Sequence, residues 1–229
     1  MNFFQDFFSL IYPNNCMACG NNLFRNEHLI CTACLFHLPK TNYHLEPDNP
    51  ISQTFWGRTS INTAAACYFF TKAGKVQHLV HQLKYKGKKE VGVFIGEIYG
   101  KELIKAPVFE RTDVIIPVPL HPSKEKKRGY NQSEVFAIGL SASMDVPIDT
   151  KTLIRTYASE TQTRKTRFKR WENVKEIFSL QDKEKLKNKH ILLVDDVITT
   201  GATIEACANL LNTIEGVTIN IASIAVASH

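Results

Sequence analysis

Two adjacent carboxylates beside a threonine-rich loop are the residues of this chain best suited to do chemistry. Residues 191–203 read Ile-Leu-Leu-Val-Asp-Asp-Val-Ile-Thr-Thr-Gly-Ala-Thr. The apolar, β-branched run 191–194 predicts a buried parallel strand, and Asp195 and Asp196 then lie at its carboxyl end. Ligands of open α/β sheets bind at that edge. Carboxylates placed there are suited to accept hydrogen bonds from hydroxyl groups.

The loop that follows offers a site for an anion. It consists of Thr199, Thr200, Gly201, Ala202 and Thr203, and it leads into a helix expected over residues 204–214. Backbone N–H groups at the start of a helix attract anions, and threonine hydroxyls add further donors. Carboxylates next to such a loop fit a sugar phosphate. The alternative is a strand, a turn and a helix cap that hold no ligand.

Four cysteines near the N-terminus form two Cys-x2-Cys pairs with an eleven-residue gap: Cys16, Cys19, Cys31 and Cys34. Each pair forms a tight turn whose sulfur atoms can face one metal, and four thiolates complete the tetrahedral shell of a zinc ion. Disulfides are the alternative, which a cytoplasmic protein disfavours. Because a closed shell has no open position for catalysis, we expect this zinc to stabilise the fold.

The basic residues of the chain are clustered. The formal net charge is +6, and lysine and arginine concentrate in residues 84–89, 124–128 and 164–175. Such runs form either a solvated surface or a positive rim around a polyanionic substrate or a nucleic acid.

The N-terminal residues and the hydropathy of the chain bear on its location. No apolar run reaches the length of a transmembrane helix, and residues 1–11 lack the basic start and cleavage site of a signal peptide. We therefore expect a cytoplasmic protein. Phenylalanines at 3, 4, 7 and 8 line one face of a short helix, which either joins the core or docks on a partner or, peripherally, on a membrane.

The remaining sequence supplies the elements that must position these groups. Strands are predicted over residues 61–70, 113–117, 191–194 and 217–226, and helices over 76–85, 91–104, 132–143 and 203–214. Alternating strands and helices predict an α/β fold with a mostly parallel sheet and flanking helices. We expect an N-terminal helix and zinc-binding module in residues 1–50, a linker at 51–60, and the α/β domain at 61–229.

A stiff, basic stretch follows the second predicted strand. Prolines at 117, 119 and 122 restrict its backbone. The hydrogen-bond donors near these prolines are His121, Ser123, Arg128, Asn131 and Gln132. We interpret this stretch as an anion-binding loop, with a proline-rich connector and a solvated turn as the alternative.

Several of these motifs resemble known families. Val-Asp-Asp-Val-Ile-Thr-Thr-Gly-Ala-Thr resembles the phosphoribosyl-pyrophosphate (PRPP) signature of type I phosphoribosyltransferases. This implies that Asp195 and Asp196 hold the ribose 2′ and 3′ hydroxyls and that the loop at 199–203 holds the 5′-phosphate.

A second resemblance covers nearly the whole chain. Leu-Lys-Tyr-Lys-Gly at 83–87, Ile-Pro-Val-Pro-Leu-His-Pro at 116–122 and Lys-Lys-Arg-Gly-Tyr-Asn-Gln at 126–132, with the four cysteines, resemble the ComF/GntX family. That resemblance implies a type I phosphoribosyltransferase-like domain behind a zinc module. It also implies a role in DNA uptake and natural transformation, with competence proteins as partners.

For a PRPP-binding protein the resemblance implies displacement of pyrophosphate from the anomeric carbon, with catalysis by positioning and charge stabilisation. Asp195 and Asp196 are then the catalytic pair, and Asp196 is the best candidate for a general base. Magnesium would bridge the pyrophosphate and the ribose hydroxyls. The candidate pyrophosphate- or anion-binding residues are Lys84, His121, Arg128, Asn131, Gln132, Arg164 and Arg170. Residues 163–175 form either a mobile lid over this site or a basic surface helix.

Three functions remain open at this point. The first is a magnesium-dependent phosphoribosyltransferase with an unidentified acceptor. The second is a single-stranded DNA-binding module for which PRPP is only a ligand. Aromatic residues beside basic ones favour this second function, since they can stack on bases: Tyr85, Tyr130, Phe168 and Trp171. The third is a scaffold whose zinc module and phenylalanine stripe recruit partners.

Overall fold

The computed structural model describes residues 14–156 and 178–227, and a four-stranded sheet forms its centre. The strands are β1 (Thr63–Phe70), β2 (Val114–Pro117), β5 (His190–Ile198) and β6 (Thr218–Ala227). They lie in the order β1-β6-β5-β2, and every neighbouring pair is parallel. All four carboxyl ends therefore point toward one edge of the sheet, where this class of fold binds its ligands.

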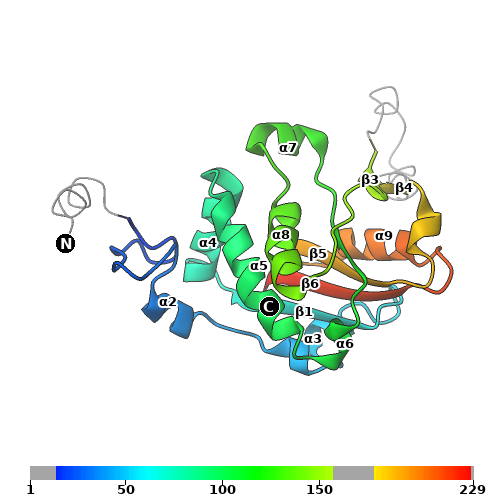
Figure 1. Cartoon of the computed structure of the whole chain (residues 1–229), viewed down its shortest axis with the longest axis horizontal. Helices are drawn as coiled ribbons and strands as arrows, with labels where there is room; N and C mark the ends of the chain where they lie inside the picture. Colours follow the sequence, from blue (N-terminus) through cyan, green and yellow to red (C-terminus); the bar gives the residue numbers. More distant parts are fainter. Residues whose placement is uncertain (1–13, 157–177, 228–229) are drawn as a thin grey trace.

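Helices cover both faces of the sheet (Figure 1). One face carries α4 (Lys75–Tyr85), α5 (Lys89–Leu103) and α8 (Gln132–Met144), and the other carries α9 (Ala202–Leu211). Successive side chains of a strand point to opposite faces. Leu192 and Val194 of β5 therefore pack with the first group of helices, and Ile191 and Leu193 pack with α9. The prediction of an α/β fold with a parallel sheet and flanking helices is confirmed.

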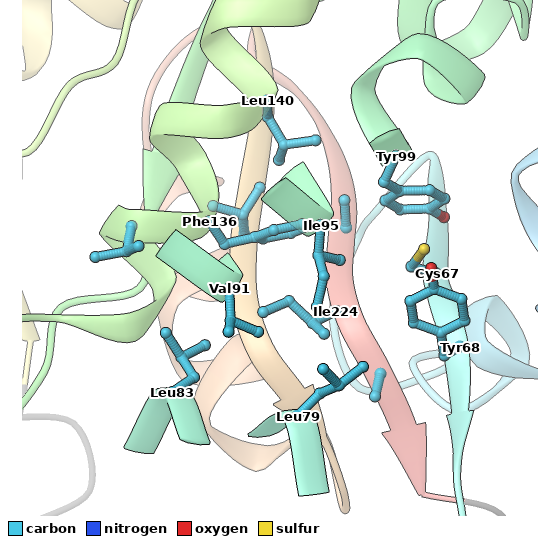
Figure 2. Packing of buried hydrophobic residues seen from close by; sticks show 14 of the residues in the cluster. Cys67, Tyr68, Leu79, Leu83, Val91, Ile95, Tyr99, Phe136, Leu140 and Ile224 are labelled. Carbon is cyan, nitrogen blue, oxygen red and sulfur yellow. The ribbon is translucent and has the colours of Figure 1, made fainter. Parts of the chain in front are cut away.

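The larger part of the hydrophobic core lies between α4, α5, α8 and the sheet (Figure 2). Leu83, Ile95 and Phe136 come from the three helices and pack in one cluster with Ile224 of β6. A glycine lets α5 and α8 approach closely, because a Cβ on Gly96 would lie 2.4 Å from the carbonyl oxygen of Phe136. This packing holds α4 and α8 rigidly beside the carboxyl ends of the strands.

The N-terminal segment packs against the first strand. It contains α2 (Thr32–His37), η1 (Tyr43–Leu45) and α3 (Pro50–Gln53). The backbone N–H of Thr41 donates to Cys67 O at 3.1 Å, and that of Phe69 donates to Pro39 O at 2.8 Å. Ile51 and Phe55, in the predicted linker, are buried in the core on the α9 side. The domain division at residues 50 and 60 stays a prediction, and the structure adds that residues 51–60 contribute to the core.

Short elements complete the described chain: α6 (Pro107–Glu110), α7 (Pro122–Arg128), β3 (Leu153–Arg155), β4 (Phe178–Leu180) and η5 (Lys183–Leu186). β3 and β4 form an antiparallel ribbon outside the main sheet. Residues 122–128 form helix α7, where the sequence predicts an anion-binding loop or, as the alternative, a solvated turn. Its start is favoured by Pro122 in the first turn and by His121, whose side chain accepts a hydrogen bond from the Ser123 N–H.

The strand that carries the two carboxylates is longer than the sequence predicts. β5 continues to Ile198, beyond the predicted end at Val194. The reason lies in its two neighbours: β2 stops at Pro117, which pairs with Val194, whereas β6 stays paired with β5 as far as Val226. Asp195 and Asp196 are therefore held by the sheet on one side and open on the other.

In the part of the chain that the structure describes, no helix is both long and apolar enough to cross a bilayer. The phenylalanine stripe of residues 3–8 and the predicted anion-binding residues Arg164 and Arg170 lie outside the described residues. The same holds for the predicted lid at 163–175 and for Phe168 and Trp171.

Candidate functional site

The two carboxylates of β5 leave the strand in different directions and meet different partners. Lys84 Nζ, at the end of α4, lies 2.9 Å from Asp196 Oδ1. Asp195 Oδ1 accepts one hydrogen bond from Ser133 Oγ over 2.9 Å and another from the Asp196 N–H over 2.8 Å. Ser133 is buried in the first turn of α8, so the start of that helix fixes the orientation of Asp195.

A cavity of about 570 Å³ opens at this edge of the sheet and brings most of the predicted residues together. Those that line it are Lys84, Arg128, Asn131, Gln132, Asp195, Asp196, Thr199 and Thr203. They come from α4, α7, β5, the loop after β5 and the starts of α8 and α9, which the sequence separates by more than one hundred residues. The predicted residues His121, Thr200, Gly201 and Ala202 are not among those that line it.

The carboxylates are electrostatically unequal. Burial and, second, the neighbouring carboxylate of Asp196 raise the pKa of Asp195 to about 7, against the lowering effect of the hydrogen bonds from Asp196 N–H and Ser133 and of the charge of Lys84. A carboxyl with a pKa near neutral pH changes its charge under physiological conditions. The sequence favours Asp196 as the general base, whereas these surroundings make Asp195 the better candidate.

The loop after β5 is held in shape by the segment predicted to be a linker. Gly201 has φ of +74°, and a Cβ there would lie 2.9 Å from Phe55 Cε1. Arg58 Nη1 donates to Thr200 O over 3.1 Å, and Arg58 also forms an ion pair with Glu205 in the first turn of α9. Residues 51–60 therefore position the candidate anion loop, a role that the sequence does not predict for them.

Three of the predicted donors already form hydrogen bonds within the fold. Asn131 Oδ1 accepts from the Ser133 N–H at 3.1 Å, and its Nδ2 donates to Val118 O at 3.0 Å. Gln132 Oε1 accepts from Arg128 Nη1 at 2.6 Å. His121 Nδ1 lies 2.7 Å from Ser123 Oγ at the start of α7. Asn131 and Gln132 thus shape the wall of the cavity and orient Arg128.

Ser133 and Arg155 line the cavity but are absent from the sequence-based set. Ser133 directly follows Asn131 and Gln132, and a serine in the first turn of a predicted helix was the available signal. Arg155, at the end of β3, also lines the cavity. Nothing in the pattern around a single arginine in a short strand indicates that the fold turns it toward β5.

The four cysteines of the N-terminal segment form a cluster that fits zinc. Their sulfur atoms all lie within 4.8 Å of one another, and Cys19 Sγ is 3.9 Å from Cys31 Sγ. A tetrahedron with zinc–sulfur bonds of about 2.3 Å has sulfur atoms about 3.8 Å apart. The Cys31 N–H donates to Cys16 Sγ over 3.2 Å, which is how thiolate ligands are commonly supported. The cluster packs on α4, where His78 Nδ1 lies 3.2 Å from Ala18 O.

Comparison with known proteins agrees with this geometry. The family model described as "Phosphoribosyl transferase domain" matches residues 125–228, which include both carboxylates and the loop after them. "DNA utilization protein YhgH" of Shigella flexneri is 30% identical over 200 residues, covering 86% of this chain and 83% of that protein.

Two further relatives match over a shorter stretch. "Competence protein F" of Haemophilus influenzae is 37% identical over 100 residues, which are 43% of this chain and 44% of the relative. "Competence protein ComFC" of Bacillus subtilis is 32% identical over 98 residues, covering 43% of this chain and 38% of the relative.

Proposed function

The chain belongs to the ComF/GntX family of proteins with a phosphoribosyltransferase domain, and on this premise we propose that the cavity at the end of β5 binds PRPP. The observation that carries the proposal is the composition of that cavity. The same cavity is lined by two carboxylates, by Thr199 and Thr203 of the threonine-rich loop at the start of α9, and by the cations Lys84 and Arg128. PRPP has the matching set of groups, namely a phosphate at one end, hydroxyls in the middle and a pyrophosphate at the other end.

In this proposal each group of the cavity has its own task. Asp195 and Asp196 accept hydrogen bonds from the ribose hydroxyls. The loop at 199–203 binds the 5′-phosphate with backbone N–H groups and threonine hydroxyls. Lys84 and Arg128 neutralise the pyrophosphate. Asn131 and Gln132 position these groups, because their side-chain amides are already bonded to Val118 O and Arg128.

The reaction we propose is transfer of the phosphoribosyl group to an acceptor. The bond between the anomeric carbon and pyrophosphate breaks, pyrophosphate leaves with the electron pair, and the acceptor forms a new bond to that carbon. Lys84 and Arg128 stabilise the charge that develops on the leaving group. Asp195 takes the proton that the acceptor loses, since its pKa of about 7 suits a general base at neutral pH.

Magnesium fits this set of donors. Carboxylate oxygens are ligands that Mg²⁺ prefers, and Asp195 and Asp196 present them at the edge of the cavity. When bound, the ion would supply positive charge between the carboxylates and the anionic ligand, which otherwise repel each other. Lys84 meets part of this need, because its ammonium group lies beside Asp196.

Calorimetry with PRPP and MgCl₂ tests the proposal. We expect saturable binding to the wild type and none to a variant with Asp195→Ala and Asp196→Ala, while a control with Asp182→Ala and Glu184→Ala binds like the wild type. The control residues are exposed acids near η5. The proposal is refuted if the wild type binds no PRPP, or if the variant with Asp195→Ala and Asp196→Ala keeps the wild-type affinity for PRPP.

A second candidate function, binding of single-stranded DNA, is favoured by the rim of the same cavity. Tyr85 is 65% exposed, its ring packs 5.1 Å from that of His81, and the guanidinium of Arg128 lies 5.6 Å from the ring centre. An exposed aromatic ring among cations can stack on a base. The names of the relatives point the same way, and we propose that the protein acts in the cytoplasm in DNA uptake or utilisation.

Anisotropy with a labelled oligothymidylate tests this second function. We expect log K to fall linearly with log salt, and Tyr85→Ala to weaken binding about tenfold. Exposed Phe24→Ala is the matched control, because Phe24 lies beyond the cavity, near the cysteine cluster. A slope near zero would exclude the basic rim as the binding surface.

A further inference from the structure

Arg155 brings to the cavity a positive charge that the described part of the fold leaves uncompensated. It ends β3 and lines the cavity together with Asp195 and Thr203. Its Nε is buried and, among the described residues, has no hydrogen-bond partner. By contrast, Lys84 is paired with Asp196, and Arg128 donates to Gln132.

The described residues around Arg155 do not balance its charge. Its guanidinium lies 5.2 Å from the ring centre of Phe178, which is a weak attraction. Burial lowers the pKa of Arg155, and the thiol of Cys207 acts in the opposite direction. Burial also raises the pKa of that thiol, so it is neutral at physiological pH. A partly buried guanidinium that no described counter-charge balances costs stability, and ionisable groups in perturbed surroundings are concentrated at functional sites.

The position of Arg155 indicates which anion it would meet. The ring of Phe178, on which Arg155 lies, lines a groove of α9 with Ala202 and Ala206. Arg155 therefore lies near the first turns of α9, where the loop at 199–203 leads in. Lys84 and Arg128 belong to α4 and α7, and Figure 1 shows α4 well separated from β3 and α9.

We propose that Arg155 binds the same phosphate monoester as the loop at 199–203, so that a guanidinium and backbone N–H groups hold it from two sides. The inference rests on the proposed PRPP site and assigns to it a residue that the sequence does not reveal. The planar fork of arginine suits this task, since it donates two parallel hydrogen bonds to phosphate oxygens.

Calorimetry with three ligands tests the assignment: ribose 5-phosphate, inorganic pyrophosphate and PRPP with MgCl₂. In Arg155→Met we expect the affinity for ribose 5-phosphate and PRPP to fall 10- to 100-fold, as for loss of a hydrogen bond to a charged group. The affinity for pyrophosphate stays within about twofold. Arg155→Lys keeps the charge but lacks the planar fork, so we expect its affinities for ribose 5-phosphate and PRPP to fall between those of the wild type and Arg155→Met. Arg111→Met, at an exposed arginine before the start of β2, is the matched control and changes none of the three.

Thermal unfolding without ligand separates binding from support of the fold. Because Arg155→Met removes an unpaired charge and keeps an apolar contact with Phe178, we expect its Tm to equal or exceed that of the wild type. If the wild type binds ribose 5-phosphate and Arg155→Met binds it with the same affinity, the assignment of Arg155 is overturned and the proposal of PRPP binding is left intact. A lower Tm with equal losses for all three ligands would overturn it too, since Arg155 would then be structural. A wild type that binds neither PRPP nor ribose 5-phosphate would instead refute the proposed function itself.

Discussion

Asp195→Asn tests the electrostatics of the site through the stability of the protein. The pKa of Asp195 is raised from its ordinary 3.8 to about 7, first by burial and then by the charge of Asp196. At about 1.36 kcal/mol per pKa unit, this corresponds to a destabilisation of roughly 4 kcal/mol when the carboxylate is fully ionised. Two effects reduce the gain expected from removing this charge. Asp195 is only half-buried, so solvent screens its charge, and an uncharged asparagine is a weaker acceptor for the hydrogen bond from Ser133 Oγ. We therefore expect Asp195→Asn to gain about 1–2 kcal/mol at pH 8 without ligand.

The pH dependence gives the sign of this effect. A carboxyl whose pKa is raised in the folded state keeps its proton there while the unfolded chain has already lost it. The wild type therefore loses stability relative to Asp195→Asn as pH rises from about 4 through about 7, and the difference levels off about one pH unit above the folded-state pKa.

Urea unfolding of both proteins at pH 5, 6, 7 and 8 measures the difference, with the exposed Asp182→Asn as control. Asp182 has φ of +45°, a conformation that asparagine also adopts readily. A variant at Asp195 that is less stable than the wild type at every pH, or a gain that does not grow between pH 5 and 7, would refute the reasoning.

Three other perturbations have expected outcomes. Metal analysis of purified protein is expected to give about one zinc per chain, and removing it with a chelator is expected to lower the Tm, whereas Cys67→Ala, outside the cysteine cluster, leaves the metal content unchanged. Gly201→Ala is expected to cost about 1–2 kcal/mol in urea unfolding, because alanine is strained at φ of +74° and its Cβ meets Phe55. Arg58→Ala is expected to weaken PRPP binding in calorimetry roughly threefold to tenfold with little change in stability, since its ion pair with Glu205 is partly exposed and its bond to Thr200 O shapes the loop.

The sequence predicted the central elements of the fold because their patterns are local. A continuous apolar run marks β5, and Val76, Leu79, Val80 and Leu83 repeat with helical spacing along α4 and are all buried. The end of β5 was predicted too early, because a charged pair normally marks the edge of a buried strand. Whether a strand continues past such a pair depends on its neighbours, and the length of β6 cannot be read from residues 191–198.

The residues of the candidate site likewise differ in whether a local sequence pattern reveals them. The carboxylates and the loop at 199–203 are contiguous, so a motif reveals them. Arg155 and Ser133 contribute through tertiary placement, which no local pattern encodes. Phe55 and Arg58 lie in a stretch with prolines and weak periodicity, yet they support the loop from the other side of Gly201. Residues that hold a loop in shape need only a fitting surface, and many sequences provide one.

The distribution of charge within the cavity distinguishes between the two candidate ligands, PRPP and single-stranded DNA. A single strand of nucleic acid carries a negative charge at every nucleotide, so it is repelled by a pair of carboxylates in the middle of its path. In the proposed mode of binding, Asp195 and Asp196 lie between the cations of α4 and α7 and Arg155, and all of these line the cavity. PRPP has uncharged hydroxyls at the corresponding place and anionic groups at both ends. We therefore expect the interior of the cavity to bind the sugar phosphate, and a DNA strand to follow the exposed rim at Tyr85 and the nearby lysines. Because the two ligands would share Lys84 and Arg128, we expect PRPP with magnesium to weaken binding of the oligothymidylate rather than to leave it unchanged.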